Sequence, residues 1–72
     1  MIILREDILT IVDQIKIYLD SGVSVKLFTS LKNSTKDTSP ITSIELKERS
    51  LFINNEIVID TKDIALLKIM FD

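Results

Sequence analysis

The chain has 72 residues and a formal net charge of −2, and it contains neither cysteine nor histidine. A chain of this length forms at most one domain, which buries only about 60% of the surface that its unfolded form exposes. Without cysteine, disulfides and thiolate metal ligands are excluded, and zinc is not expected. Hydrophobic residues make up 46% of the chain, so aliphatic packing or self-association must supply the stability.

The first predicted element is a helix over residues 5–20. Aliphatic residues recur there at helical spacing and form one apolar stripe: Ile8, Ile11, Val12, Ile15 and Leu19. Gly22 is the only glycine, and we expect it to end the helix with a positive φ. We expect residues 1–4 to tuck apolar side chains against the body, although a short edge strand or a flexible start fits the same residues.

Residues 23–29 alternate in polarity and predict a strand with one buried face. Phe28 interrupts the polar face of this strand, so it is expected to contact the helix or a partner. Residues 30–40 are rich in Ser, Thr, Asn, Asp and Pro, which indicates a loop. A mobile hairpin loop and a binding loop both fit this composition, with Leu31 as an apolar anchor.

Further strands are predicted over residues 41–47, 50–54, 56–60 and 65–71. Asparagine tolerates a positive φ, so Asn54 and Asn55 predict a tight hairpin turn. The run of residues 57–59 is apolar on both faces and predicts a central strand, which the helix would cover on one side.

The segment of residues 64–71 fits two structures. Its Ala, Leu and Met residues favour a helix, which Asp60 or Thr61 would cap. Its alternating side chains also fit a strand. We favour a single helical turn near residues 61–64, followed by a closing strand.

A helix followed by five short strands in meander order resembles the small Sm-like and SH3-like barrels. In those barrels a strand leads into a short turn, often Asp-Ile, before the closing strand. Within residues 56–64, Asp63 and Ile64 stand at that place. The resemblance implies an α+β fold, with the N-terminal helix packed on a five-stranded antiparallel, SH3/Sm-like, partly open barrel.

This chain departs from the RNA-binding members of the Sm family. Those proteins carry an Asp-x-Asn loop after the second strand and an Arg-Gly or Lys-Gly pair after the fourth. Residues 47–50 and 61–63 stand at these places and hold neither pattern. The second strand also lacks the glycine that usually permits its strong bend. These departures count against RNA binding of that type.

The residue inventory argues against an enzyme. Without histidine or cysteine, the commonest general bases and activated nucleophiles are missing. Each acidic pair has a structural explanation, namely the helix dipole, a capping turn or exposure to solvent. The pairs are Glu6 with Asp7, Asp60 with Asp63, and Glu45 with Glu48. No cofactor or metal is expected, because a single glycine cannot build a phosphate loop and no loop has the acidic spacing of a calcium site.

We therefore expect a non-catalytic interaction or regulatory module that binds a protein, either a second copy of itself or a larger partner. An exposed strand edge would allow sheet extension between chains. The residues expected at the contact are apolar side chains with a lysine rim: Phe28, Leu31, Phe52 and Met70, with Lys32 and Lys36.

Two rival functions fit the same sequence. A nucleic-acid-binding barrel would use a diffuse basic surface and an aromatic residue for stacking, but the acidic net charge disfavours it. Its cations would be Lys26, Lys32, Lys36 and Lys62. An inhibitor protein of a phage or other mobile element would have a similar size and composition. No apolar run reaches the roughly 20 residues of a membrane span and no export signal is visible, so a cytoplasmic protein is expected.

Overall fold

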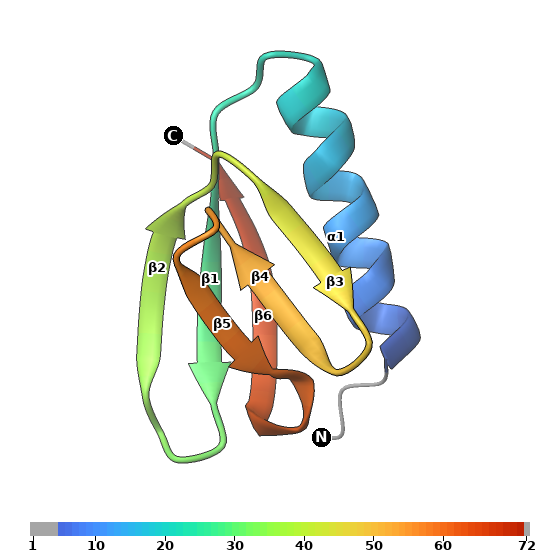
Figure 1. Cartoon of the computed structure of the whole chain (residues 1–72). Coiled ribbons are helices and arrows are strands. Elements are labelled where there is room, and N and C mark those ends of the chain that lie inside the picture. Colours follow the sequence, from blue (N-terminus) through green and yellow to red (C-terminus); the bar gives the residue numbers. More distant parts are fainter. Residues whose placement is uncertain (1–4, 72) are drawn as a thin grey trace.

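The computed structural model describes residues 5–71, and the side chains of residues 6–71. In this part of the chain, one N-terminal helix is followed by six strands in two antiparallel three-stranded sheets (Figure 1). The expected α+β class is confirmed, whereas the expectation for residues 1–4 lies outside the described residues. The elements are α1 (Arg5–Asp20), β1 (Val25–Leu31), β2 (Lys36–Pro40), β3 (Ile44–Lys47), β4 (Ser50–Ile53), β5 (Ile57–Asp60), a 3-10 turn η1 (Thr61–Asp63) and β6 (Ile64–Phe71).

Helix α1 buries the apolar stripe that the sequence predicts. Ile8 and Val12 are 1% exposed and Ile15 is fully buried. The helix ends at Asp20, and Gly22 follows two residues later with a φ of +78°. The Gly22 N–H donates to the carbonyl of Leu19 at 3.1 Å, and the next N–H in the chain donates to the carbonyl of Tyr18 at 2.9 Å. This pair of bonds is the Schellman ending, which a left-handed glycine permits.

The first sheet has the order β2-β1-β6. Leu27 of β1 lies opposite Ser39 of β2 on one side and Ile69 of β6 on the other. Residues 64–71 therefore form a strand, preceded by the short helical turn η1, as favoured from the sequence. The side chain of Asp60 caps this turn by accepting a 3.0 Å hydrogen bond from the N–H of Lys62.

The loop expected over residues 30–40 is wrong in its second half, because Lys36–Pro40 forms strand β2. The connection from β1 is short, and the N–H of Leu31 donates across it to the carbonyl of Thr35 at 2.7 Å. Strand β2 contains four polar residues and a proline, and none of them is buried. Strand β2 is defined by its backbone hydrogen bonds to β1. Its polar side chains show no strand pattern, so the sequence did not predict it.

The second sheet has the order β3-β4-β5, with β4 at its centre. Leu51 of β4 is fully buried and Ile53 is 2% exposed. Strand β5 is an edge strand in which Val58 is 60% exposed. The prediction of residues 57–59 as the buried centre is therefore wrong, because an aliphatic side chain on a small protein does not require burial. Helix α1 packs mainly against β3, β6 and β1.

Two connections hold the sheets together. The first is the corner of residues 40–43 between β2 and β3, where the side chain of Asn54 binds the backbone of three residues. The second is η1, where the N–H of Thr61 donates to the carbonyl of Arg49 at 2.7 Å. The result is a pair of three-stranded sheets rather than the expected five-stranded barrel. Their facing sides and α1 form one aliphatic core.

Candidate functional site

The six residues predicted for a contact do not form one surface. Phe28 and Met70 lie on the outer face of the first sheet, because the alternate residues of β1 are buried and the pairing of β1 with β6 puts Met70 on the same side as Phe28. Phe52 lies on the outer face of the second sheet. Leu31 faces a cleft between the sheets. Lys32 is exposed in the short loop between β1 and β2.

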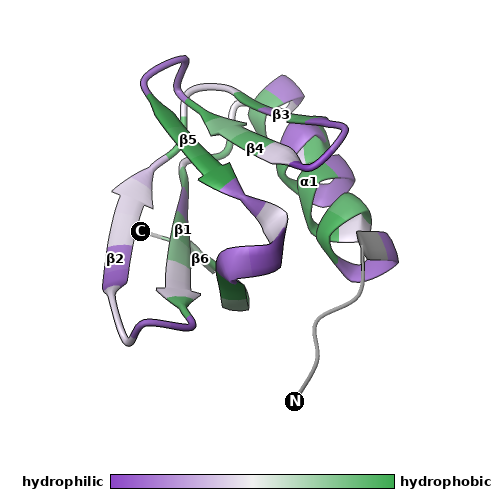
Figure 2. Cartoon of the chain, turned by 60° about the horizontal axis from the view of Figure 1, so that its bottom comes forward, coloured by the Kyte–Doolittle hydropathy of each residue, from purple (hydrophilic) through white to green (hydrophobic). Residues whose placement is uncertain are grey.

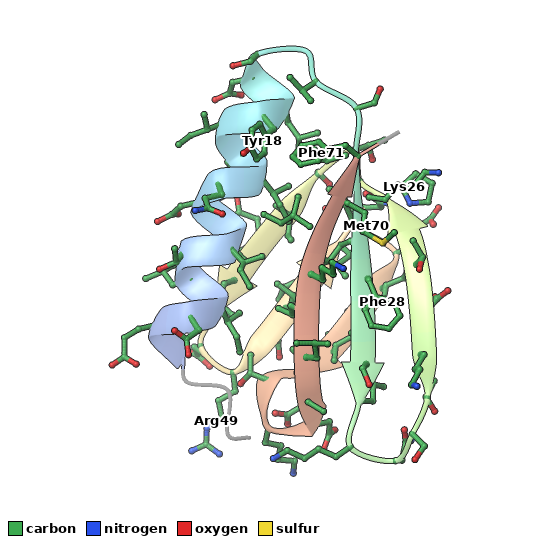
Figure 3. All side chains as sticks on the ribbon, turned by 180° about the vertical axis from the view of Figure 1, so that it is seen from behind. Tyr18, Lys26, Phe28, Arg49, Met70 and Phe71 are labelled. Atoms are coloured by element: carbon green, nitrogen blue, oxygen red, sulfur yellow. The ribbon has the colours of Figure 1, made fainter. Side chains whose placement is uncertain are left out.

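The outer face of the first sheet is the largest of these surfaces. Its members follow from alternation along the strands, because residues paired across antiparallel strands point to the same side. We call it the Phe28 face. It consists of Lys26, Phe28 and Ser30 of β1, Lys36, Thr38 and Pro40 of β2, and Leu66, Lys68 and Met70 of β6. Figure 3 looks onto this side of the molecule, and no described helix or strand lies over it.

Apolar side chains occupy the middle of the Phe28 face. Phe28 lies opposite Thr38 on one side and Lys68 on the other. Leu66 and Met70 are its diagonal neighbours on β6, within reach of a large side chain. They are 43% and 38% exposed. An aromatic ring flanked by exposed aliphatic side chains is the composition that protein interfaces favour at their centre.

The charge on the Phe28 face is entirely positive. Lys26, Lys36 and Lys68 belong to it, and none of its other members is acidic. Lys36 and Lys68 are exposed. Because the whole chain carries a net charge of −2, this face is electrostatically distinct from the rest of the molecule.

Sequence reasoning missed Leu66 and Lys68 as members of the Phe28 face. Their sides could not be assigned while residues 64–71 fitted both a helix and a strand. The alternation of Leu66, Lys68 and Met70 with the inward-facing Leu67 and Ile69 was the available signal. It becomes decisive only once the pairing of β6 with β1 is known.

The outer face of the second sheet is smaller and of mixed charge. Phe52 lies opposite Glu45 and Val58 on the neighbouring strands. The ammonium of Lys47 lies 5.9 Å from the centre of the Phe52 ring, at the limit of a cation–π contact. Part of the Phe52 ring is therefore already in contact with a side chain of the same molecule.

A cleft opens between β2 and β5, which are edge strands of different sheets. Its volume is about 160 Å³. Isoleucines of β4 and β5 line one side, and Asp37 and Ser39 of β2 line the other. Figure 2 shows the same contrast, with a hydrophobic β5 and a hydrophilic to neutral β2. The two sheets are therefore not closed into a barrel on this side.

The carboxylates do not assemble into a chemical site in the described part of the chain. No group of three or more acidic side chains there is arranged to hold a metal ion. Asp60 is engaged as the cap of η1, and its second oxygen lies 3.9 Å from the ammonium of Lys62. Glu45 forms a 3.3 Å salt bridge with Lys16 of α1. In the same residues, no helix is long and apolar enough to cross a membrane.

Comparison with known proteins adds no relative. No protein-family model, curated protein or solved structure matches the chain.

Proposed function

We propose that this chain is a small non-catalytic interaction module that binds an acidic protein surface through the Phe28 face. One observation carries the proposal: a half-buried aromatic ring and two exposed apolar side chains are surrounded by three lysines on a sheet face that no described element covers. In such an interface the buried aromatic group supplies most of the affinity. The lysines at the rim supply orientation and speed of association.

A protein partner fits this face better than a nucleic acid does. Binding of single strands relies on a strongly basic groove and several stacking rings, whereas the Phe28 face has one ring. The alternative of a nucleic-acid-binding module is thus less well supported.

The proposal includes an architecture related to the SH3-like and Sm-like barrels. Only residues 41–43 separate strand β2 from strand β3, so together they can be counted as one bent strand. Five strands then follow the helix, and η1 precedes the closing strand β6, which pairs with β1. Asn54 supports the bend at the corner, where the barrels commonly use glycine.

Affinity capture from a native lysate tests the proposed function. The wild-type chain is compared with Phe28→Ser and with a matched control, Val58→Ser, which removes an exposed apolar side chain from the other sheet. We expect the wild type and the control to retain the same acidic proteins, and Phe28→Ser to lose them. Equal capture by all three chains, or capture that nuclease treatment abolishes, would overturn the proposal.

A further inference from the structure

The outward side of α1 carries a second surface, opposite in charge to the Phe28 face. Glu6, Leu9, Asp13, Ile17 and Asp20 are spaced by three or four residues and therefore share one side of the helix. We call them the acidic stripe. All five are exposed, and its apolar members Leu9 and Ile17 are 45% and 64% exposed. The solvent side of a helix is normally polar, so Leu9 and Ile17 give this side of α1 an apolar component that is accessible for contact.

The acidic stripe and the Phe28 face are complementary in composition. The stripe has three carboxylates around two aliphatic side chains, and the face has three lysines around Phe28, Leu66 and Met70. Docking would bring apolar groups against apolar groups and ammonium groups against carboxylates. That arrangement buries hydrophobic area without burying unpaired charge.

The two surfaces also match in size. Three strands spaced by about 4.8 Å make a face roughly 10 Å wide, close to the diameter of one helix. Along its strands, the face places Lys26 and Lys36 four residues apart in register, or about 13 Å. Along the helix, Asp13 and Asp20 are seven residues apart, or about 10 Å. A helix laid along the sheet can therefore present its carboxylates to the lysines.

The stripe and the face are separate surfaces of the same molecule. Figure 3 shows α1 beside the sheet, with the Phe28 face turned toward the viewer. Among the described side chains, Lys16 forms a salt bridge with Glu45 and Lys62 forms one with Asp60. Neither uses a residue of the stripe, so its carboxylates are not committed to these pairs.

We infer that the Phe28 face of one copy binds the acidic stripe of a second copy. This inference rests on the proposed function, because it names one occupant of the same face. The contact joins two different surfaces, so it is heterologous, and each added copy leaves one face and one stripe open. Such contacts build rings if the rotation closes and filaments if it does not.

Charge reversal on each side separately, followed by mixing, tests this contact. The sheet variant carries Lys36→Glu and Lys68→Glu. The helix variant carries Asp13→Lys and Asp20→Lys, of which the second places a cation in the last helical turn, where the dipole favours it. The control carries Lys47→Glu and Glu56→Lys, two exposed positions outside both surfaces. Circular dichroism establishes that each variant is folded.

Sedimentation velocity of the full chain reports the assembly. We expect the wild type and the control to self-associate at low salt, and to dissociate at about 1 M salt, where the Debye length is only about 3 Å. Each variant alone should associate at least about tenfold more weakly, because its own stripe and face carry the same sign. An equal mixture of the two variants should associate again, since each stripe then meets a face of opposite charge.

Two results would overturn the inference: a wild type that stays monomeric at low salt, or a mixture that associates no better than its components. Either result leaves the proposed function standing if acidic proteins from the lysate are still captured in a Phe28-dependent manner. If that capture also fails, the Phe28 face itself is not a binding surface.

Discussion

The side chain of Asn54 donates a 2.7 Å hydrogen bond from its Nδ2 to the backbone carbonyl of Pro40, and this bond ties the β4–β5 turn to the corner between the two sheets. The same side chain accepts from the N–H of Thr42 at 2.7 Å and from the N–H of Ser43 at 3.2 Å. Asn54 has a φ of +57°, so it also makes the turn that presents its amide to the corner. One residue therefore serves both the hairpin and the junction of the sheets.

Replacement of Asn54 by glycine should remove the corner bonds while keeping the positive φ accessible. We expect Asn54→Gly to lower the free energy of unfolding by about 2 kcal/mol, for the loss of several partly exposed hydrogen bonds. Urea unfolding followed by circular dichroism measures the change. Asn55→Gly is the matched control, because Asn55 has a φ of +56° and an exposed side chain. Equal effects at the two positions would show that the corner bonds contribute nothing.

Gly22→Ala isolates the backbone strain at the end of α1. A Cβ added at Gly22 would meet no atom within 4 Å, so the substitution causes no clash and only the positive φ opposes it. We expect the free energy of unfolding to fall by about 1 kcal/mol, which lowers the melting temperature of a domain of this size by about 4–8 °C. Ser21→Ala, at the preceding exposed position, should leave the melting temperature nearly unchanged. An unchanged melting temperature for Gly22→Ala would contradict the Schellman ending.

Because β4 is the central strand of the second sheet and β5 is an edge strand, truncating a side chain of β4 should destabilise the protein much more than truncating one of β5. Leu51→Ala removes a fully buried side chain of the central strand and should cost about 2–5 kcal/mol. Val58→Ala removes an exposed side chain of the edge strand and should cost less than about 1 kcal/mol. Denaturant titration of both variants measures the difference. A larger effect at Val58 would restore β5 as the buried centre.

The sequence predicted the elements that depend on local signals. The apolar stripe of α1, the glycine that ends it and the asparagine turn each follow from a short run of residues, and the structure confirms them. Strand β2 escaped prediction because its polar side chains are all outside the core, so only backbone pairing defines it.

The candidate site could be predicted only in part. Phe28 and Met70 stood out as apolar residues at unexpected places, but their proximity depends on the register between β1 and β6, which are far apart in the chain. Lys68 was missed for the same reason. Phe52 was grouped with them from its residue type alone, although it belongs to the opposite sheet. Residue chemistry thus indicated candidates, and strand pairing decided which of them share a surface.

Amide chemical-shift mapping of the isotope-labelled chain tests most directly whether the Phe28 face is the binding surface. The protein recovered by Phe28-dependent capture is added to the labelled chain, and the shifts are compared with those of the free chain. We predict that the largest shifts fall on the strands of the first sheet, at Lys26, Phe28 and Lys68. Shifts confined to β3, β4 and β5, or to residues lining the cleft between β2 and β5, would contradict the account.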